Sequence, residues 1–174
     1  MCYELPMMPV APIRIRPIVA AETRHLRQAV LRPQQAAVEL VYPGDDDPRT
    51  RHLGAFVGDR LVGIASIYVD PMPARSSDRP SPGVDPGPAD TDWRLRGMAT
   101  LPEVRGKGVG GALLQACLDH VGTMGGSRLW CNARTTAAGF YLRYRFEIHG
   151  EEFELPGIGP HYRMSRAIRL STED

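Results

Sequence analysis

Arg105-Gly106-Lys107-Gly108-Val109-Gly110 decides the fold, because it joins a strand-like run, Trp93 to Thr100, to a helix-like run, Gly111 to Val121. Glycines let several backbone N–H groups turn toward one point without a Cβ in the way. The following helix adds the positive end of its dipole, which favours an anion. The residues from Arg105 to Gly111 therefore predict a diphosphate cradle, with Arg105 and Lys107 supplying positive charge.

Two other glycine-rich motifs fit this stretch less well. Gly106, Gly108 and Gly111 satisfy G-x-G-x-x-G, but the dinucleotide motif opens directly off a strand and meets an acidic residue about 20 residues later. Here 101–105 intervene, and 127–132 carries no acid. A Walker A loop is excluded, because Leu101 stands where its first Gly belongs and Lys107 is followed by Gly. A glycine-rich connection without a ligand is the plain alternative.

The surrounding sequence resembles the GCN5-related N-acetyltransferases, the GNAT superfamily. The central motif of that family is Arg or Gln, two residues, Gly, one residue, then Gly or Ala, and Arg105, Gly108 and Gly110 match it. A second match, Leu129 to Phe146, looks like the strand, helix and Phe-Tyr pair that complete the family's acetyl-CoA site. The resemblance extends over nearly the whole chain from about Ile13.

Composition limits the classes of partner. The chain has 174 residues, 43% of them hydrophobic and 24% charged, as in a single soluble globular domain. A net charge of +1 gives no global attraction to nucleic acid or to an anionic membrane, and no apolar run is long enough to span one. Cys2, Cys117 and Cys131 lack metal-ligand spacing, and the last two are expected to be small core residues. We expect a cytoplasmic protein without a metal, and a homodimer is left open.

The hydrophobic pattern predicts a mixed α/β order of elements. Helices are expected at 22–31, 111–121 and 136–143, and strands at 13–18, 52–57, 60–69, 93–100, 128–133, 146–155 and 162–168. Gly58-Asp59 predicts a tight hairpin. The GNAT resemblance implies a mixed, largely antiparallel central sheet with flanking helices and a V-shaped splay between the fourth and fifth strands.

Proline marks the segments outside regular structure. Residues 1–12, with Pro6, Pro9 and Pro12, are expected to form a flexible leader before an acetyltransferase domain at 13–174. The stretch 70–92 holds six prolines in 23 residues, which excludes a strand or a helix. We interpret it as an insertion between two strands, a passive linker rather than a substrate lid.

The resemblance implies transfer of an acetyl group from acetyl-CoA to a primary amine of a small molecule or a peptide. In the family, the central strand is splayed from the next one after a bulge. Backbone groups at the positions of Met98, Ala99 and Thr100 can then pair with the pantetheine amides and polarise the thioester carbonyl. Asn132 belongs to the second acetyl-CoA motif, and Arg143 resembles the basic position that reaches the adenosine 3′-phosphate.

Tyr141 is the first catalytic candidate, because the Tyr of the family's Phe-Tyr pair protonates the leaving thiolate. Its alternative role is that of a core tyrosine. His161 ends a Pro-Gly-Ile-Gly-Pro-His segment that resembles the Gly-Ile-Pro-His of one bacterial GNAT subgroup, in a loop that borders the acceptor site in the family. His161 is the candidate base, although water can also serve. Arg145 departs from the family, which commonly has Gly before the Phe at 146.

Other functions remain open at this level. An acyl-CoA-binding sensor or regulatory module of the same fold would need the cradle but no acid at the sulfur. A dinucleotide oxidoreductase is disfavoured by the misplaced glycines. For the acceptor, the acidic stretches Asp45-Asp46-Asp47 and Glu151 to Glu154 suggest a cationic amine, with a solvated acidic face as the alternative for the glutamates.

Overall fold

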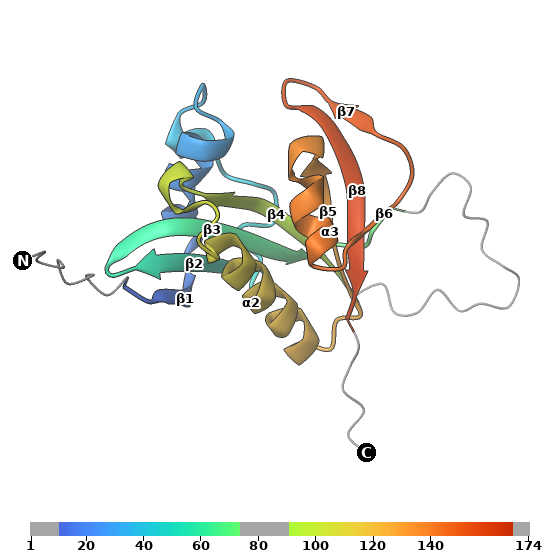
Figure 1. The fold of residues 1–174 in the computed structure, drawn as a ribbon, viewed down its shortest axis with the longest axis horizontal. Helices are drawn as coiled ribbons and strands as arrows, with labels where there is room; N and C mark the ends of the chain where they lie inside the picture. Colours follow the sequence, from blue (N-terminus) through green and yellow to red (C-terminus); the bar gives the residue numbers. More distant parts are fainter. Residues whose placement is uncertain (1–10, 74–90, 169–174) are drawn as a thin grey trace, which may run out of the picture.

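The computed structural model describes residues 11–73 and 91–168 and places them around one eight-stranded sheet (Figure 1). Neighbouring strands follow the order β1-β2-β3-β4-β5-β8-β6, and β7 pairs with β8. Within these ranges only β4 and β5 run parallel, and the other pairs are antiparallel. The mixed, largely antiparallel sheet is confirmed. The strands are β1 (Ile13–Ile18), β2 (Arg51–Val57), β3 (Arg60–Val69), β4 (Asp92–Thr100), β5 (Arg128–Arg134), β6 (Glu147–Ile148), β7 (Phe153–Leu155) and β8 (Gly159–Ala167).

Helices cover both faces of the sheet. The longest, α2 (Val109–Thr123), packs across β1 to β5 and adds Leu113 and Cys117 to the larger apolar core. On the other side, α1 (Ala20–Leu26) packs on β2 and β3. Ala65 belongs to the α2 core and Ile64 to a smaller cluster with Leu26 of α1. Because successive side chains of a strand alternate, the two clusters lie on opposite faces.

Shorter helical segments complete the layers. α3 (Ala138–Arg143) packs beside β5 after a 3₁₀ turn, η5 (Thr135–Ala137). The π-helical turn η1 (Arg27–Leu31) continues α1. Two further 3₁₀ turns are η2 (Ala37–Glu39), which precedes the loop to β2, and η4 (Pro102–Val104), which precedes the glycine loop.

The parallel strands β4 and β5 separate soon after they begin. Their pairing covers Asp92 to Arg94 of β4 and stops there. On its other edge, β4 continues to pair with β3 as far as Thr100. The backbone groups of β4 that face β5 beyond Arg94 therefore lack a strand partner. This confirms the V-shaped splay between the fourth and fifth strands.

A bulge in β4 turns the backbone where the V widens. Gly97 has a φ of +60°, which glycine adopts without steric penalty. Two steps along β3 span three steps along β4 at this point, which is a β-bulge. Arg96 before the bulge and Ala99 after it consequently face the same side, that of α1. A Cβ on Gly97 would also lie 3.1 Å from the ring of Tyr42, so a side chain there would require this ring to shift slightly.

A buried ion pair fixes the loop between η2 and β2 against the α1 face of the sheet. The side chains of Arg27 and Asp45 are 0% and 1% exposed and share two hydrogen bonds, of 2.6 and 2.9 Å. The Tyr68 hydroxyl and the Tyr42 N–H donate to the same carboxylate, at 2.6 and 2.8 Å. Burial alone would raise the pKa of Asp45, but hydrogen bonds from Arg27, Tyr68 and Tyr42 outweigh it and lower the pKa to about 2.

Several expected elements differ in the structure. The helix expected at 22–31 begins at Ala20 and changes to π-helical geometry at Arg27. The strand expected at 146–155 is split into β6 and β7 by a bend in which Gly150 has a φ of +82°. Of the acidic residues in this run, Glu151 and Glu152 precede β7, and Glu154 lies within it. β8 begins at Gly159, so His161 lies in a strand and not, as expected, in a loop.

Other sequence expectations are confirmed. Val57 pairs with Arg60 around the two-residue turn Gly58-Asp59. Cys117 and Cys131 are buried, and burial raises the pKa of each thiol to about 12, as expected for core residues. The expected leader, apart from residues 11–12, and the stretch 74–90 of the proline-rich insertion lie outside the described residues.

The buried ion pair predicts a pH-dependent stability. The pKa of Asp45 is about 2 in the folded protein and 3.8 ordinarily, so its carboxylate stabilises the fold above about pH 4 and loses this effect as the pH falls toward 2. Asp45→Asn leaves Arg27 buried without a counter-charge, which is expected to lower the free energy of unfolding by about 3 kcal/mol at neutral pH. In denaturant titrations the gap between variant and parent is expected to narrow between about pH 4 and pH 2.

The matched control is Asp59→Asn, which removes an exposed carboxylate paired with Arg14. Exposed pairs contribute little to stability, so we expect no measurable change. A gap between Asp45→Asn and the parent that stays constant over the acidic range would contradict the prediction.

Candidate active site

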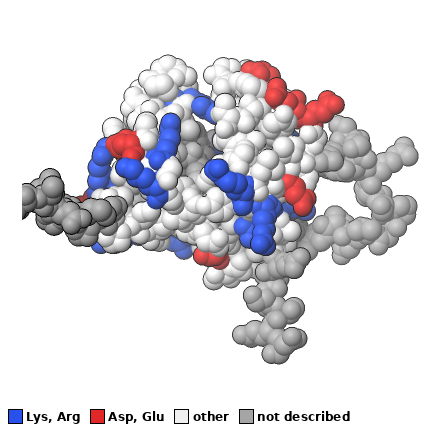
Figure 2. All heavy atoms as spheres, viewed as in Figure 1, with Lys and Arg blue, Asp and Glu red and all other residues white. Residues whose placement is uncertain are grey.

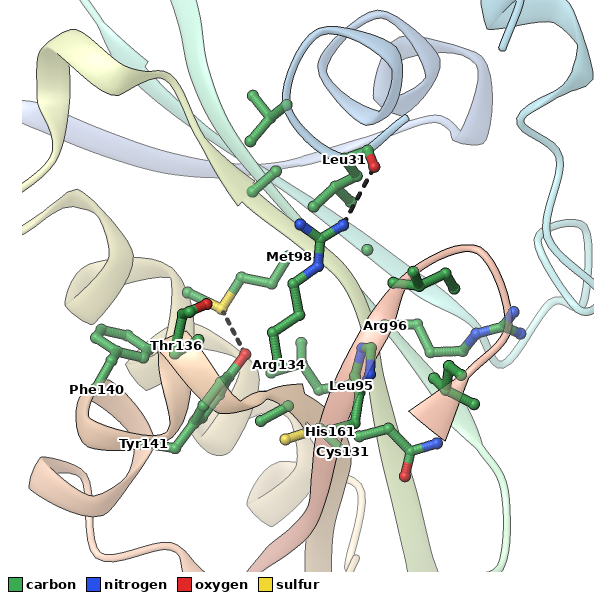
Figure 3. A pocket seen from close by; sticks show the side chains of 18 of the residues that line it. Leu31, Leu95, Arg96, Met98, Cys131, Arg134, Thr136, Phe140, Tyr141 and His161 are labelled. Carbon is green, nitrogen blue, oxygen red and sulfur yellow. Dashed lines mark hydrogen bonds between the residues drawn. The ribbon is translucent and has the colours of Figure 1, made fainter. Parts of the chain in front are cut away.

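The V between β4 and β5 opens into a cavity of about 640 Å³, a size typical of small-molecule sites (Figure 3). Its walls come from both splayed strands, from α3 and η5, and from the end of η1. The turn between β7 and β8 and the first residues of β8 close the remaining side. The cavity thus joins segments that are distant in the sequence at the opening between β4 and β5.

The glycine loop forms a second hollow, of about 470 Å³, beside this cavity. Gly106 and Gly108 have φ values of +74° and +86°, and no atom lies within 4 Å of the place where a Cβ would stand. Gly108 is the N-cap of α2 and gives no side-chain cap, so the first N–H groups of the helix lack partners there. Arg105 and Arg143 line the hollow. These features fit a diphosphate.

Gly110 and Gly111 line the same hollow and lie close to aromatic side chains. A Cβ on Gly111 would lie 1.9 Å from the hydroxyl oxygen of Tyr144, and one on Gly110 would lie 3.4 Å from the ring of Phe140. The contact of Gly110 is an ordinary van der Waals distance, whereas a side chain on Gly111 would require Tyr144 to move. The hollow and the cavity share three lining residues: Thr100, Arg105 and Phe140.

The order of the elements, the splayed parallel pair and the glycine loop ahead of α2 together define the fold of one family. The model of the acetyltransferase (GNAT) family matches residues 19–146, which is more than half of the chain. This chain belongs to the GNAT family. It is accordingly an acyltransferase, and its family uses acetyl-CoA as the acetyl donor.

Relatives of this GNAT protein agree with the assignment. The uncharacterized N-acetyltransferase YitI of Bacillus subtilis (strain 168) is 31% identical over 159 residues, which cover 91% of this chain and 99% of YitI. Escherichia coli ElaA has a similar crystal structure, with a TM-score of 0.65, 19% identity and coverage of 89% and 99% of the two chains. An aminoglycoside 6′-N-acetyltransferase complexed with coenzyme A gives a TM-score of 0.67, 15% identity and coverage of 92% and 99%. The two structures confirm the GNAT fold.

Tyr141 of the GNAT α3 helix lines the cavity and is 8% exposed. Its hydroxyl donates a hydrogen bond to Sδ of Met98 at 3.7 Å, across the V (Figure 3). Burial, followed by the neighbouring Cys131 and Cys117, raises the pKa of Tyr141 well above 10. The hydroxyl therefore stays protonated at neutral pH and remains a hydrogen-bond donor.

Arg145 determines how α3 ends below Tyr141. Arg145 has a φ of +62°, and its N–H donates to the carbonyl of Leu142 while the N–H of Phe146 donates to that of Tyr141. These two bonds define a Schellman motif, whose left-handed residue is usually Gly. The ring centroids of Phe146 and Tyr141 lie 5.3 Å apart, which is the apolar contact typical of the motif. Arg145 thus adopts the conformation that Gly commonly supplies in the family.

His161 of β8 is 4% exposed and lines the cavity. Its Nδ1 lies 2.7 Å from the carbonyl oxygen of Gly159. A carbonyl can only accept, so Nδ1 carries the proton and Nε2 of the neutral ring keeps a free lone pair. Arg134 is the residue opposite His161 in the register of β5 and β8.

The other sequence-predicted site residues fall into three groups. Met98, Ala99, Thr100 and Asn132 line the cavity, and Oδ1 of Asn132 is buried without a hydrogen-bond partner. Val109 has its side chain in the core, so only its N–H can take part in the cradle. Lys107 is exposed and lines neither hollow.

Sequence reasoning missed the basic character of the cavity. Among the residues that the structure describes, no Asp or Glu lines it, whereas five arginines do: Arg32, Arg94, Arg96, Arg105 and Arg134. Figure 2 shows Lys and Arg side chains gathered around the middle of the same face, with acidic side chains nearer its edges. The available signal was the alternation of Arg94 and Arg96 with Leu95, which places two arginines on one face of a strand.

The acidic stretches do not form the acceptor site. Asp45 is buried against Arg27, and Asp47 pairs with Arg49. None of Glu151, Glu152 and Glu154 lines the cavity. The cationic acceptor that these stretches suggested is therefore not supported by their positions.

A metal site and a membrane-spanning helix each place requirements on the residues that form them. Residues 11–73 and 91–168 contain no group of three or more His, Cys, Asp or Glu side chains that could hold a metal ion. None of the helices in these ranges is both long enough and apolar enough to cross a membrane.

At Arg145, unlike at most helix positions, Gly is expected to be more stabilising than Ala. At Arg145 a left-handed backbone costs an L-residue about 1 kcal/mol and costs Gly little. We expect Arg145→Gly to have a higher free energy of unfolding than Arg145→Ala, by about 1 kcal/mol, in denaturant titrations. Gln115, exposed in the middle of α2, is the control position, where Ala should be more stable than Gly. The same order at both positions would show that Arg145 is not strained.

Proposed function

We propose that this protein transfers the acetyl group of acetyl-CoA to a primary amine held in the cavity between β4 and β5. The observation that carries the proposal is the position of the Tyr141 hydroxyl, which donates to Met98 in the stretch of β4 that has no partner strand on its β5 side. A thioester placed along that stretch would bring its sulfur to a proton donor and its carbonyl to free backbone groups. Membership of the GNAT family supports the same chemistry.

The donor would occupy the place of a missing strand. Its pantetheine arm would pair with the free edge of β4 at Met98, Ala99 and Thr100, as a peptide adds to a sheet edge. The diphosphate would rest on the N–H groups of the glycine loop and the start of α2, with Arg105 beside it. Arg143 lines the hollow formed by the glycine loop and would reach the adenosine 3′-phosphate.

The reaction forms one bond and breaks one. The lone pair of a neutral amine attacks the carbonyl carbon, the C–N bond forms, the C–S bond breaks, and sulfur leaves with the electron pair. An ordinary thiol has a pKa of about 8.5, below that of Tyr141, so full proton transfer from Tyr141 to the thiolate is uphill. Tyr141 would instead stabilise the leaving sulfur by donating a hydrogen bond as charge develops.

The amine must lose a proton, and we propose that His161 accepts it. Its Nε2 holds a lone pair as long as Nδ1 donates to Gly159. Histidine is the side chain best suited to proton exchange near neutral pH. Asn132 lines the same cavity, and its unpartnered Oδ1 could accept a second N–H from the bound amine.

Gly108→Glu tests the cradle. The new carboxylate would occupy the diphosphate position with a like charge, so we expect calorimetry to show loss of CoA binding. The matched control is Gly125→Glu, because Gly125 has a similar φ of +75° and equally open surroundings but follows the opposite end of α2. Both variants carry the same backbone strain, and only the cradle variant should lose CoA. Equal CoA affinity in the two would show that the diphosphate binds elsewhere.

Tyr141→Phe tests the chemistry. The hydroxyl is needed when sulfur leaves, so its loss should raise the transition state without affecting the bound ground state. We expect kcat to fall roughly 10²–10³-fold, as for other single donors to developing charge, with CoA affinity nearly unchanged. The measurements are thiol release from acetyl-CoA with an amine panel and calorimetry with CoA.

The outcome separates the possible roles of the tyrosine. Parent turnover in Tyr141→Phe would make Tyr141 a packing residue, and a parallel loss of CoA affinity would make it a binding group. CoA binding by the parent protein without thiol release across the panel would indicate a CoA-binding module without turnover.

A further inference from the structure

We infer that the acceptor is an amine that also carries a carboxylate, and that Arg96 and Arg134 bind this carboxylate. The inference rests on the proposed acetyl transfer and specifies the substrate class of the same cavity. It follows from the face of the sheet on which the two arginines lie, from the absence of acidic partners for them among the described residues, and from the position of Arg134 opposite His161.

Strand alternation separates these two arginines from the diphosphate cradle. Leu95 of β4 and Ala133 of β5 belong to the apolar core beneath α2. Their neighbours Arg96 and Arg134 therefore point to the opposite face of the sheet. The cradle lies at the N-terminus of α2, so the charges of Arg96 and Arg134 are not needed for CoA phosphates.

Two other arginines on this face already have acidic partners. Arg27 is neutralised by Asp45, and Nη1 of Arg94 lies 3.2 Å from the carboxylate of Asp70. These pairs leave no net charge to offer a ligand. Neither arginine accounts for the excess of positive charge in the cavity.

Arg96 and Arg134 have no carboxylate partner within residues 11–73 and 91–168. The nearest polar contact of Arg96 is the carbonyl of Pro43 at 3.5 Å, and its guanidinium lies 4.8 Å from the ring centroid of Tyr42. Arg134 donates only to the carbonyl of Leu31, at 3.2 Å (Figure 3). Each guanidinium keeps further donors that can serve a ligand.

The cost of holding Arg96 in this place points to an anionic ligand. Burial, followed by the charge of Arg94, lowers the pKa of the Arg96 guanidinium from its ordinary value. A bound carboxylate would offset both effects by supplying an opposite charge and a hydrogen-bond acceptor. A polyamine would add positive charge to a cavity whose described lining has no acid.

The register of β5 and β8 limits the size of the acceptor. Arg134 and His161 are directly opposite in the ladder, so their Cβ atoms are neighbours at about 5 Å. Because the two side chains start side by side, the distance from the Arg134 guanidinium, which reaches the carbonyl of Leu31, to Nε2 of His161 is limited by the lengths of these two side chains. An acceptor whose carboxylate and amine contact these two groups is therefore a compact molecule, such as an amino acid or a close analogue, rather than an aminoglycoside.

The test compares acceptors that differ only in the charge. The common L-amino acids and β-alanine, the carboxamides of those that react, and spermidine are supplied with acetyl-CoA, and thiol release is followed. We expect kcat/KM to be at least 10-fold higher for an amino acid than for its carboxamide. The carboxamide has the less basic amine, so the intrinsic chemistry works against this result.

Variants assign the preference to residues. Arg96→Gln and Arg134→Gln should each raise KM for the amino acid roughly 10–100-fold and leave CoA affinity unchanged, because charge-assisted hydrogen bonds to the carboxylate are lost. Arg96→Lys keeps the charge and should retain part of the preference. Arg14→Gln, on exposed β1, is the control and should behave as the parent.

A binding measurement keeps this inference separate from the proposed function. Amino acids and their carboxamides are titrated calorimetrically into the protein with CoA, which requires no turnover. Carboxylate-dependent binding that is lost in both Gln variants supports the inference, even if thiol release fails and the transferase proposal falls. Equal binding and use of amino acids and carboxamides, preference for spermidine, an unchanged amino-acid KM in both Gln variants, or no binding of any amino acid would overturn it.

Discussion

The site depends on the point at which β4 and β5 stop pairing. Two parallel strands that share only three register positions leave the rest of their facing edges without partners. Unpaired backbone groups in a protein interior are unfavourable, so such an opening persists only if a ligand, water or another group satisfies them. In a GNAT protein the gap is the place where a substrate can act as the missing strand. The cavity is therefore a consequence of sheet topology more than of any one side chain.

Two features keep the V open. On the α2 side, α3 fills the lower part of the gap, and its Schellman end ties Phe146 to Tyr141 so that the tyrosine ring has one orientation. On the α1 side, the Arg27–Asp45 pair holds the loop that carries Tyr42, and the Tyr42 ring lies between the guanidinium groups of Arg27 and Arg96. A buried ion pair is often no more stable than an apolar replacement. Here the pair also fixes one wall of the cavity. An apolar pair could not do this in the same way, because it would lack the hydrogen bonds to the loop.

Local sequence patterns predicted the parts of the site that depend on local conformation. The glycines of the loop need particular φ values, and the stripe of α2 follows from helical periodicity, so both are visible within a few residues. The bulge in the central strand came from the family resemblance, and a Gly inside that strand is the local signal that places the bulge at Gly97. The bend that splits β6 from β7 was missed, although Gly150 within the expected strand is a signal of the same kind.

Contacts between residues far apart in the chain could not be predicted from local sequence patterns. Asp45 stands in an acidic, proline-flanked loop, which in isolation indicates solvent exposure, and nothing local connects it to Arg27, 18 residues away. The placement of His161 opposite Arg134 depends on the register of two strands and on where β8 begins. Resemblance supplied the identity of the Phe-Tyr pair, whereas the charge of the cavity required the sheet to be assembled.

The absence of a carboxylate from the described lining of the cavity has a consequence for the amine itself. An acid near the acceptor nitrogen would stabilise the ammonium form, which has no lone pair with which to attack. Nearby positive charge has the opposite effect and favours loss of the proton. Arg96 and Arg134 would thus attract the carboxylate end of an acceptor and disfavour the charged form of its amine end. The same two charges would bind the substrate and lower the pKa of its amine, so that His161 could remove the proton more easily.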